Sequence, residues 1–419
     1  MNQWLVLAIV TATLILMLVR PWGIAEAWVA FAGAIVTLLT GAVPLAALPG
    51  VIRETENVLL FLAGMLLLTG IAERAGIFAA MAELCVRAAR GNGRVLYVCL
   101  FLLGALVTAT LSLDVTVIML TPIIYALTSR RKLDPVPYLF GCVFVANTAS
   151  LVLPISNLTN LLIYARIDVT FGAFVRVMWW PNLVALTANL IIFLWIFRRR
   201  IPERFAMHGG DDKYASAGID PWLIVNGVVV TATLAAIFAL GLTNRPLWWA
   251  SLTGAGILSI AAFASGRLSA RRAWHDLSPN IFVFIVSMTV VVDGFQRRWL
   301  DGHLLNLPAS EAKAALIGVL GGAVGSNVVN NVPMTILALP IIERAAPVAQ
   351  HALAYGTLIG TNIGPALTTY GSLATMLWLT LVRRRGIEVS TGDYLRVSTV
   401  TVPIVLLATS AALVLVLIA

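Results

Sequence analysis

The sequence predicts an all-α membrane protein built from two inverted repeats, each with five transmembrane helices and one re-entrant hairpin. Three observations support this fold class: long apolar runs, an internal repeat, and polar segments in the middle of several runs. The 419 residues are 60% hydrophobic and 11% charged, whereas a soluble domain carries about 25% charged residues. Runs of roughly twenty apolar residues match the hydrocarbon thickness of a bilayer. Because each span must satisfy its own backbone hydrogen bonds there, we expect helices.

The apolar runs predict ten full spans. They are expected at about 3–19, 24–42, 56–73, 138–165, 174–197, 221–241, 246–265, 278–295, 351–382 and 395–418. Two further stretches, about 94–128 and 313–343, are expected to be hairpins that return to the side they entered from, since the basic residues flanking the first one then share a face. The amphipathic segment 75–90 between spans is typical of a helix lying at the membrane surface.

The basic residues predict the orientation. With this threading, one face receives twenty of the 28 Lys and Arg side chains. By the positive-inside rule that face is cytoplasmic, and both termini are then extracytoplasmic in a bacterial-type inner membrane. The net charge of +9 is therefore explained by topology, and no nucleic-acid partner is expected.

An internal repeat divides the chain into two halves. Three segments recur in the same order, at separations of 223, 218 and 215 residues. The pairs begin at Asn57 and Asn280, at Thr110 and Val328, and at Asn147 and Asn362. We therefore expect a first repeat over 1–197, a cytoplasmic linker over 198–220 and a second repeat over 221–419. Each half holds an odd number of full spans, so the second enters the membrane upside down, which is typical of transporters with a midplane site.

Four polar segments interrupt the apolar runs, at 108–116, 147–160, 326–333 and 361–375. Unpaired polar groups in hydrocarbon cost several kcal/mol, so such segments are expected to line a cavity. Proline and glycine in the second and fourth segments predict broken helices at the midplane. The predicted substrate-binding residues are Ser112, Asn147, Ser156, Asn157, Thr159, Asn327, Asn330, Asn331, Thr361, Asn362, Gly371 and Ser372. The Gly356, Gly360 and Gly364 series is interpreted as close helix packing instead.

Asp114 is the only carboxylate in these four segments. Its burial costs about 2.5–3.5 kcal/mol on insertion scales, which predicts a functional role. It is expected to carry a coupling proton or to ligate sodium with nearby oxygen atoms. The alternative is a structural carboxylate that is hydrogen-bonded to a nearby amide.

The residue types in the segments favour a neutral solute. Asn, Ser and Thr both donate and accept hydrogen bonds, as a neutral polyhydroxy molecule requires. An oxyanion or dicarboxylate would favour Arg or Lys, and neither occurs in the four segments. Cys85, Cys99 and Cys142 have no metal-ligand spacing, and no nucleotide-binding or catalytic motif is found, so no metal, cofactor or enzymatic activity is expected.

At several short segments the sequence resembles the ArsB arsenite/antimonite permeases, members of a wider ion-transporter superfamily. These segments are Arg90-Gly-Asn-Gly-Arg94, Leu120-Thr-Pro-Ile123, Thr148-Ala-Ser150, Ser156-Asn-Leu158, Ile201-Pro202, Asn330-Asn-Val-Pro333, Gly371-Ser-Leu-Ala-Thr375 and Leu377-Trp-Leu379. The resemblance implies two hairpins and two unwound helices around the substrate. It also implies efflux of trivalent arsenic or antimony, driven by the proton gradient or by a soluble ArsA-type ATPase. The chain departs from the family pattern at Leu113, where the family usually has Asn.

Together these observations predict a secondary transporter that exports arsenite or antimonite by proton antiport, with Asp114 carrying the proton. One alternative is a sodium- or proton-coupled oxyanion or dicarboxylate carrier of the same superfamily. Another is a passive metalloid channel, which could not concentrate its solute.

Overall fold

The computed structural model describes residues 3–206, 220–300 and 310–418, and this part of the chain is helical with a single isolated β-bridge. The first half contains α1 (Gln3–Val19), α2 (Glu26–Leu39), α3 (Leu48–Arg74), α4 (Ile77–Ala89), α5 (Gly93–Thr110), α6 (Leu113–Val115), the π-turn η3 (Thr116–Leu120), α7 (Thr121–Arg130), α8 (Pro135–Ala149), α9 (Leu158–Tyr164) and α10 (Phe171–Ile196). Short 3₁₀ turns, η1 (Pro21–Gly23) and η2 (Leu45–Ala47), precede α2 and α3.

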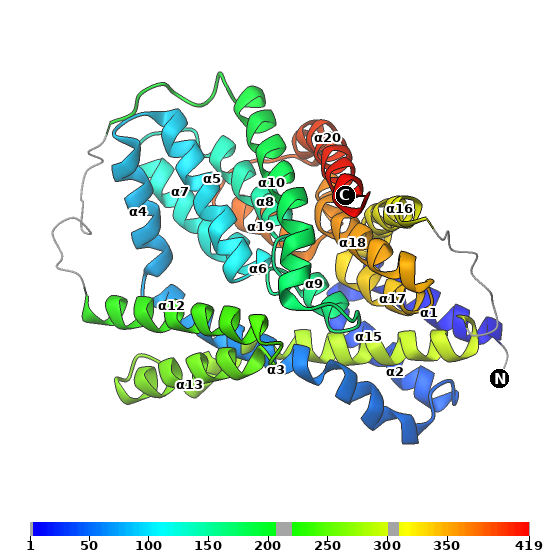
Figure 1. Ribbon diagram of the computed structural model, residues 1–419. Helices are drawn as coiled ribbons and strands as arrows, with labels where there is room; N and C mark the ends of the chain where they lie inside the picture. Colours follow the sequence, from blue (N-terminus) through cyan, green and yellow to red (C-terminus); the bar gives the residue numbers. More distant parts are fainter. Residues whose placement is uncertain (1–2, 207–219, 301–309, 419) are drawn as a thin grey trace.

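The second half contains α12 (Pro221–Leu242), α13 (Trp248–Ala264), α14 (Ala270–Leu277), α15 (Pro279–Arg298), α16 (Glu311–Val329), α17 (Asn331–Glu343), α18 (Pro347–Ile363), the 3₁₀ turn η5 (Gly364–Leu367), α19 (Leu373–Arg384) and α20 (Thr391–Ile418). Figure 1 shows α2, α3, α12, α13 and α15 along one side of the molecule, with the hairpins and broken helices on the other.

The fold class predicted from the sequence, an all-α membrane protein, is confirmed. Among the described residues, eight helices are long and apolar enough to cross a bilayer, and five shorter apolar helices accompany them. Large apolar side chains such as Ile260 (72% exposed) and Leu407 (71% exposed) face outward, where lipid would cover them. The chain is therefore a multi-pass membrane protein.

One helix is longer than the apolar run predicted. The third span was expected from residue 56, but α3 begins at Leu48. Arg53, Glu54 and Glu56 lower the hydropathy of this stretch without breaking the helix. The helix therefore extends beyond the apolar run that predicted it.

The segment from α5 to α7 folds as a hairpin. Asn92 caps α5 by accepting from the amides of Arg94 and Val95. The chain reverses at Leu111–Ser112, because the hydroxyls of Thr108 before the turn and Thr116 after it lie 2.7 Å apart. The Gly93 carbonyl, at the start of α5, accepts from the hydroxyl of Tyr138 on α8 (3.4 Å). The same end pairs with the linker, where the Phe205 amide donates to the Gly91 carbonyl (2.8 Å).

The second hairpin is tighter. A single residue, Asn330, joins α16 to α17. The α16 helix packs closely along α18 because glycines leave no side chain between the backbones: a Cβ on Gly356 or Gly360 would overlap the α16 backbone at Ala315 or Val319. The interpretation of this glycine series as helix packing is thus confirmed.

Contacts between the halves occur in matched pairs. The α3 helix packs on α13, and its counterpart α15 packs on α2. Likewise α9 contacts α17, while α19 contacts η3, and the last helices of the two halves, α10 and α20, pack on each other. A duplicated chain with a two-fold relation produces such exchanged contacts. The domain limits and the inverted orientation stay predictions.

Candidate functional site

The first broken helix lies between α8 and α9. Helix α8 ends at Ala149, and residues 150–157 form an irregular segment that includes Pro154. The Asn160 side chain satisfies two freed carbonyls by donating to Ser150 (2.6 Å) and Leu153 (3.0 Å). Asn157 then caps α9 by accepting from the Thr159 amide (3.4 Å). The break expected within 138–165 is therefore present and held by its own side chains.

The second broken helix is stabilised by side chains of another helix, α20. Helix α18 ends at Ile363 where Gly364 and Pro365 follow, and Ser372 caps α19 by accepting from the Thr375 amide (3.1 Å). The freed carbonyl of Ala366 accepts from the Tyr394 hydroxyl (2.8 Å), and that of Leu367 accepts from the Ser398 hydroxyl (2.7 Å). Both donors lie on α20 and were missed from the sequence, although their spacing of four residues places them on one helix face.

Each hairpin tip is hydrogen-bonded to the broken helix of its own half. The Leu113 amide donates to the Ser156 carbonyl (3.0 Å), and the Asn331 amide donates to the Gly371 carbonyl (3.0 Å). These four residues occupy matching positions in the internal repeat. The four polar segments predicted from the sequence therefore meet in pairs near the middle of the molecule, where Figure 1 places α6, α9 and α19.

Asn362 joins the two halves. Its Oδ1 accepts from the Ser150 hydroxyl (2.6 Å) and from the side-chain Nδ2 of Asn157 (2.6 Å). Its Nδ2 donates to Asn160 Oδ1 (2.9 Å) and to the Leu358 carbonyl (2.7 Å). With 1% of its surface exposed, Asn362 ties α18 to the break of the first half.

Asn147 occupies the matching position in the first half but behaves differently. Its Nδ2 donates to the Val143 carbonyl of its own helix (2.8 Å). Its Oδ1 is buried and has no hydrogen-bond partner. The acceptors Asn331 Oδ1 and Ser326 Oγ are also buried without a partner. A buried polar atom left unpaired costs about 1–3 kcal/mol, so these three atoms have hydrogen-bonding capacity that the described residues do not use.

Asn330 has a strained backbone. Its φ of 76° and ψ of 157° lie in a region adopted almost only by glycine. Its side chain donates weakly to the Tyr370 carbonyl (3.4 Å). Strain of this kind costs about 1–3 kcal/mol and clusters at functional sites. Asn330 is therefore a strained residue at the tip of the second hairpin, and its part in solute binding stays a prediction.

Other predicted residues use their polar groups inside the framework. The Asn327 side chain donates to the Gly364 carbonyl (2.8 Å) and accepts from Thr368 (2.7 Å). The Thr361 hydroxyl donates to the Thr357 carbonyl of its own helix (2.9 Å). The Ser156 hydroxyl donates to the Ala109 carbonyl (2.7 Å). These side chains shape the breaks and the tips.

Asp114 lies one residue past the Leu113 contact, in the first turn after Ser112, whose side chain caps that turn through the Val115 amide (3.2 Å). Within the described ranges, no donor forms a hydrogen bond or ion pair with the Asp114 carboxylate. The interpretation of Asp114 as a structural carboxylate bonded to an amide therefore finds no partner in this part of the chain.

The cysteines do not converge. The Cys85 thiol donates to the Cys99 carbonyl (3.5 Å), whereas Cys142 contacts Thr121 (4.0 Å) on the first hairpin. No group of three His, Cys, Asp or Glu side chains gathers in the residues that the structure describes. A site made of three thiolates is thus not assembled by these positions.

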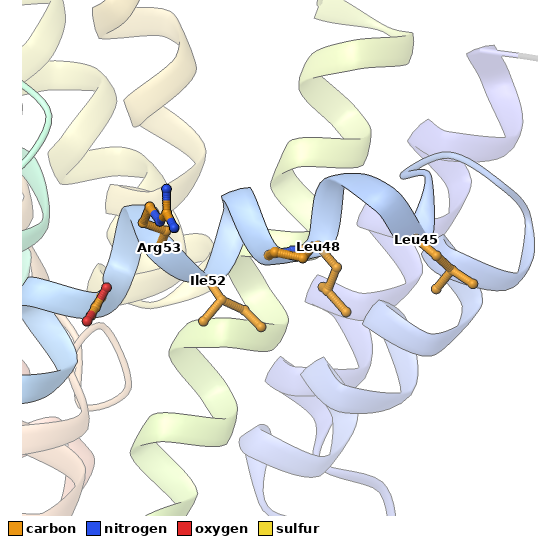
Figure 2. Close-up of a pocket in the computed structure, with 6 residues that line it drawn as sticks. Leu45, Leu48, Ile52 and Arg53 are labelled. Atoms are coloured by element: carbon orange, nitrogen blue, oxygen red, sulfur yellow. The ribbon is translucent and has the colours of Figure 1, made fainter.

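A hollow of about 430 Å³ lies elsewhere, at the start of α3. Leu45, Leu48, Ile52 and Arg53 line it together with Pro49 and Glu56 (Figure 2). None of the predicted site residues belongs to this lining.

The fold is that of a known membrane transporter. The crystal structure of the YdaH transporter of Alcanivorax borkumensis, described as having an unusual topology, superposes with a TM-score of 0.57 over 88% of this chain and 86% of that one, at 15% identity. At this identity the likeness shows a shared membrane-protein fold.

The family model described as "Citrate transporter" matches residues 5–360. The arsenical pump membrane protein of Escherichia coli K12 is 30% identical over 417 residues, which cover 97% of both chains. That of Yersinia enterocolitica is 28% identical over the same share. The chain therefore belongs to the family of the arsenical pump membrane proteins, within the citrate-transporter group.

Proposed function

We propose that this protein exports arsenite or antimonite across the inner membrane by proton antiport. The main observation in support is the network of Asn, Ser and Thr side chains at two hairpin tips and two helix breaks. Within it, buried acceptors on Asn147 and Asn331 lack hydrogen-bond partners. The names of the relatives, arsenical pump membrane proteins, support this substrate.

The chemistry of the network suits a neutral solute. Arsenous acid carries three hydroxyl groups at neutral pH, and each can donate to an amide oxygen. Three of the four helix starts are already capped by a side chain, namely those after Ser112, Asn157 and Ser372. At these helix starts a backbone amide already donates to the capping side chain. Such helix starts are therefore poorer anion sites than uncapped helix N-termini.

Asp114 is the proposed proton carrier. No donor in the described residues compensates a negative charge on this carboxylate, and carrying a proton removes the cost of an unpaired charge in the membrane interior. Binding a proton from outside and releasing it inside, in exchange for the solute, makes export depend on the proton gradient. The cytoplasmic face proposed from the basic residues places both termini outside.

Transport into inverted membrane vesicles tests the proposal. Arsenite is added outside the vesicles and an acid-inside pH gradient is imposed. Accumulation above the external concentration that collapses with a protonophore is the expected result. Equilibration without accumulation would indicate a passive channel instead.

A second candidate is a carrier of citrate or another carboxylate, favoured by the description of the matching family model. The same vesicles distinguish the two: uptake of citrate under a sodium or proton gradient, with no arsenite accumulation, would assign this function. Accumulation driven only by added ATP and a soluble ATPase would instead support an ArsA-type partner.

A further inference from the structure

A groove separate from the polar site lies between the start of α5 and the end of α10. Its volume is about 610 Å³, and it is lined by Arg94, Val95, Val98, Leu194, Trp195, Arg198 and Ile201. The two helices make few direct contacts, so the groove separates the first arm of the hairpin from α10. Figure 1 shows both helices on the hairpin side of the molecule.

The walls of the groove are apolar and face outward. Val95 is 41% exposed and Trp195 is 60% exposed. The apolar surface continues along both helices through Leu102, Leu106 and Ile191, all more than half exposed. In a membrane protein, such a strip is covered by acyl chains.

Two guanidinium groups stand at one end of this strip. Arg198 lies over the ring of Trp195, 5.6 Å from its centroid. Arg94 pairs loosely with Glu203 at 3.6 Å, and their side chains are 60% and 85% exposed. Such an exposed pair contributes little and leaves Arg94 able to bind another anion. The groove thus has two cationic side chains at one end and apolar walls along its length.

We propose that this groove is a binding site for an anionic phospholipid. The headgroup phosphate binds Arg94 and Arg198, and an acyl chain lies against Val95, Val98 and Leu194. The groove opens on the Arg-rich face predicted to be cytoplasmic, whose leaflet carries anionic lipids. Trp195, beneath the Arg198 guanidinium, is of a residue type enriched at membrane–water interfaces.

The lipid would stabilise the first hairpin. The Gly93 amide, at the start of α5, donates to the Glu203 carbonyl (3.3 Å), so a headgroup at Arg94 also holds the linker in place. Helix α5 leads to the tip that carries Asp114. The bound lipid therefore links the linker, the hairpin and α10, whichever solute the protein carries.

Native mass spectrometry of the purified full-length protein tests this inference. The detergent-solubilised protein is titrated with phosphatidylglycerol, with phosphatidylcholine and with inorganic phosphate. Because Arg94 and Arg198 would each donate charged hydrogen bonds to the headgroup phosphate, the double variant Arg94→Gln with Arg198→Gln should bind phosphatidylglycerol about 30-fold more weakly. The matched control, Arg87→Gln with Arg199→Gln, removes the same charge outside the groove and should bind as wild type does.

Val98→Trp gives an independent test, because it fills the groove without removing a charge. It should reduce phosphatidylglycerol binding while the protein keeps its melting temperature in detergent without added lipid. Equal binding of phosphatidylcholine, equal loss in both charge variants, or binding of inorganic phosphate that matches that of the lipid would each overturn the proposal. The last outcome would show a free-anion site.

Discussion

Replacing Asn362 by Ala tests whether this residue joins the two halves. The substitution removes the acceptor of the Asn157 side-chain Nδ2 and the donor to Asn160 Oδ1. Ser150 keeps a second acceptor, the Asn147 carbonyl (3.0 Å). Two buried polar groups therefore lose their strongest partner.

The expected cost follows from those two groups. A buried polar group left unpaired costs about 1–3 kcal/mol, which gives an upper range of about 2–6 kcal/mol for the pair. Polar contacts between membrane helices average about 0.6 kcal/mol, because the unfolded chain in the membrane also finds partners. We therefore expect a loss near the low end, about 2 kcal/mol, or roughly 30-fold in the folding equilibrium.

The assay is unfolding of the purified protein in mixed micelles with increasing SDS, followed by tryptophan fluorescence. The matched control is Asn147→Ala, the same change at the matching position of the repeat. Asn147 bonds only to its own helix and has an unpaired Oδ1, so its loss should cost less than about 1 kcal/mol.

A double-mutant cycle with Asn157→Ala completes the test. Asn362 and Asn157 should show a coupling energy of at least about 0.6 kcal/mol, as membrane-buried polar pairs do. Equal destabilisation by Asn362→Ala and Asn147→Ala, or no coupling to Asn157, would show that Asn362 does not join the two halves.

Three further predictions concern the site. Asp114→Asn should abolish pH-driven arsenite accumulation but preserve arsenite exchange at equal pH, which isotope or mass-label counterflow measures. Asn330→Gly should relieve backbone strain and raise stability by about 1 kcal/mol while slowing transport; a variant that is stabilised and fully active would exclude Asn330 from solute binding. Burial raises the pKa of the Cys85 thiol to about 11, so below that pH the reactive thiolate is scarce. At neutral pH its alkylation should then be roughly 100-fold slower than that of a cysteine with the ordinary thiol pKa, rising tenfold per pH unit. A variant without Cys85, Cys99 and Cys142 should still transport arsenite.

The sequence was enough to locate the hairpins and the breaks. Asn, Pro and Gly in the middle of apolar runs are expensive in lipid, so they mark positions where the helix must stop and where protein must cover it. The tips near Ser112 and Asn330 and the breaks before Asn157 and Ser372 all lie inside the predicted segments.

The partners of these groups were not predictable from the sequence. Tyr394 and Ser398 satisfy the break of α18, yet in the sequence they are ordinary polar residues near the start of a span. Asn189, which donates to the Thr148 hydroxyl (2.9 Å), was missed for the same reason. Such roles depend on which helices pack together.

The different environments of Asn147 and Asn362 were also hidden. The repeat places the same residue at both positions, so symmetry predicts equal contacts. In the structure only Asn362 reaches the opposite half, because Ser150 stands opposite it, whereas Pro365 takes the position that corresponds to Ser150 and offers no hydroxyl.

Current recording on purified protein in proteoliposomes adsorbed to a solid-supported membrane tests whether a proton moves with arsenite. Arsenite is neutral near pH 7, so a concentration jump of arsenite evokes a current only if a charged coupling ion moves with it. Proton antiport predicts a transient current that depends on the pH gradient and not on sodium. A current evoked by citrate under a sodium gradient, with none evoked by arsenite or antimonite, would contradict it.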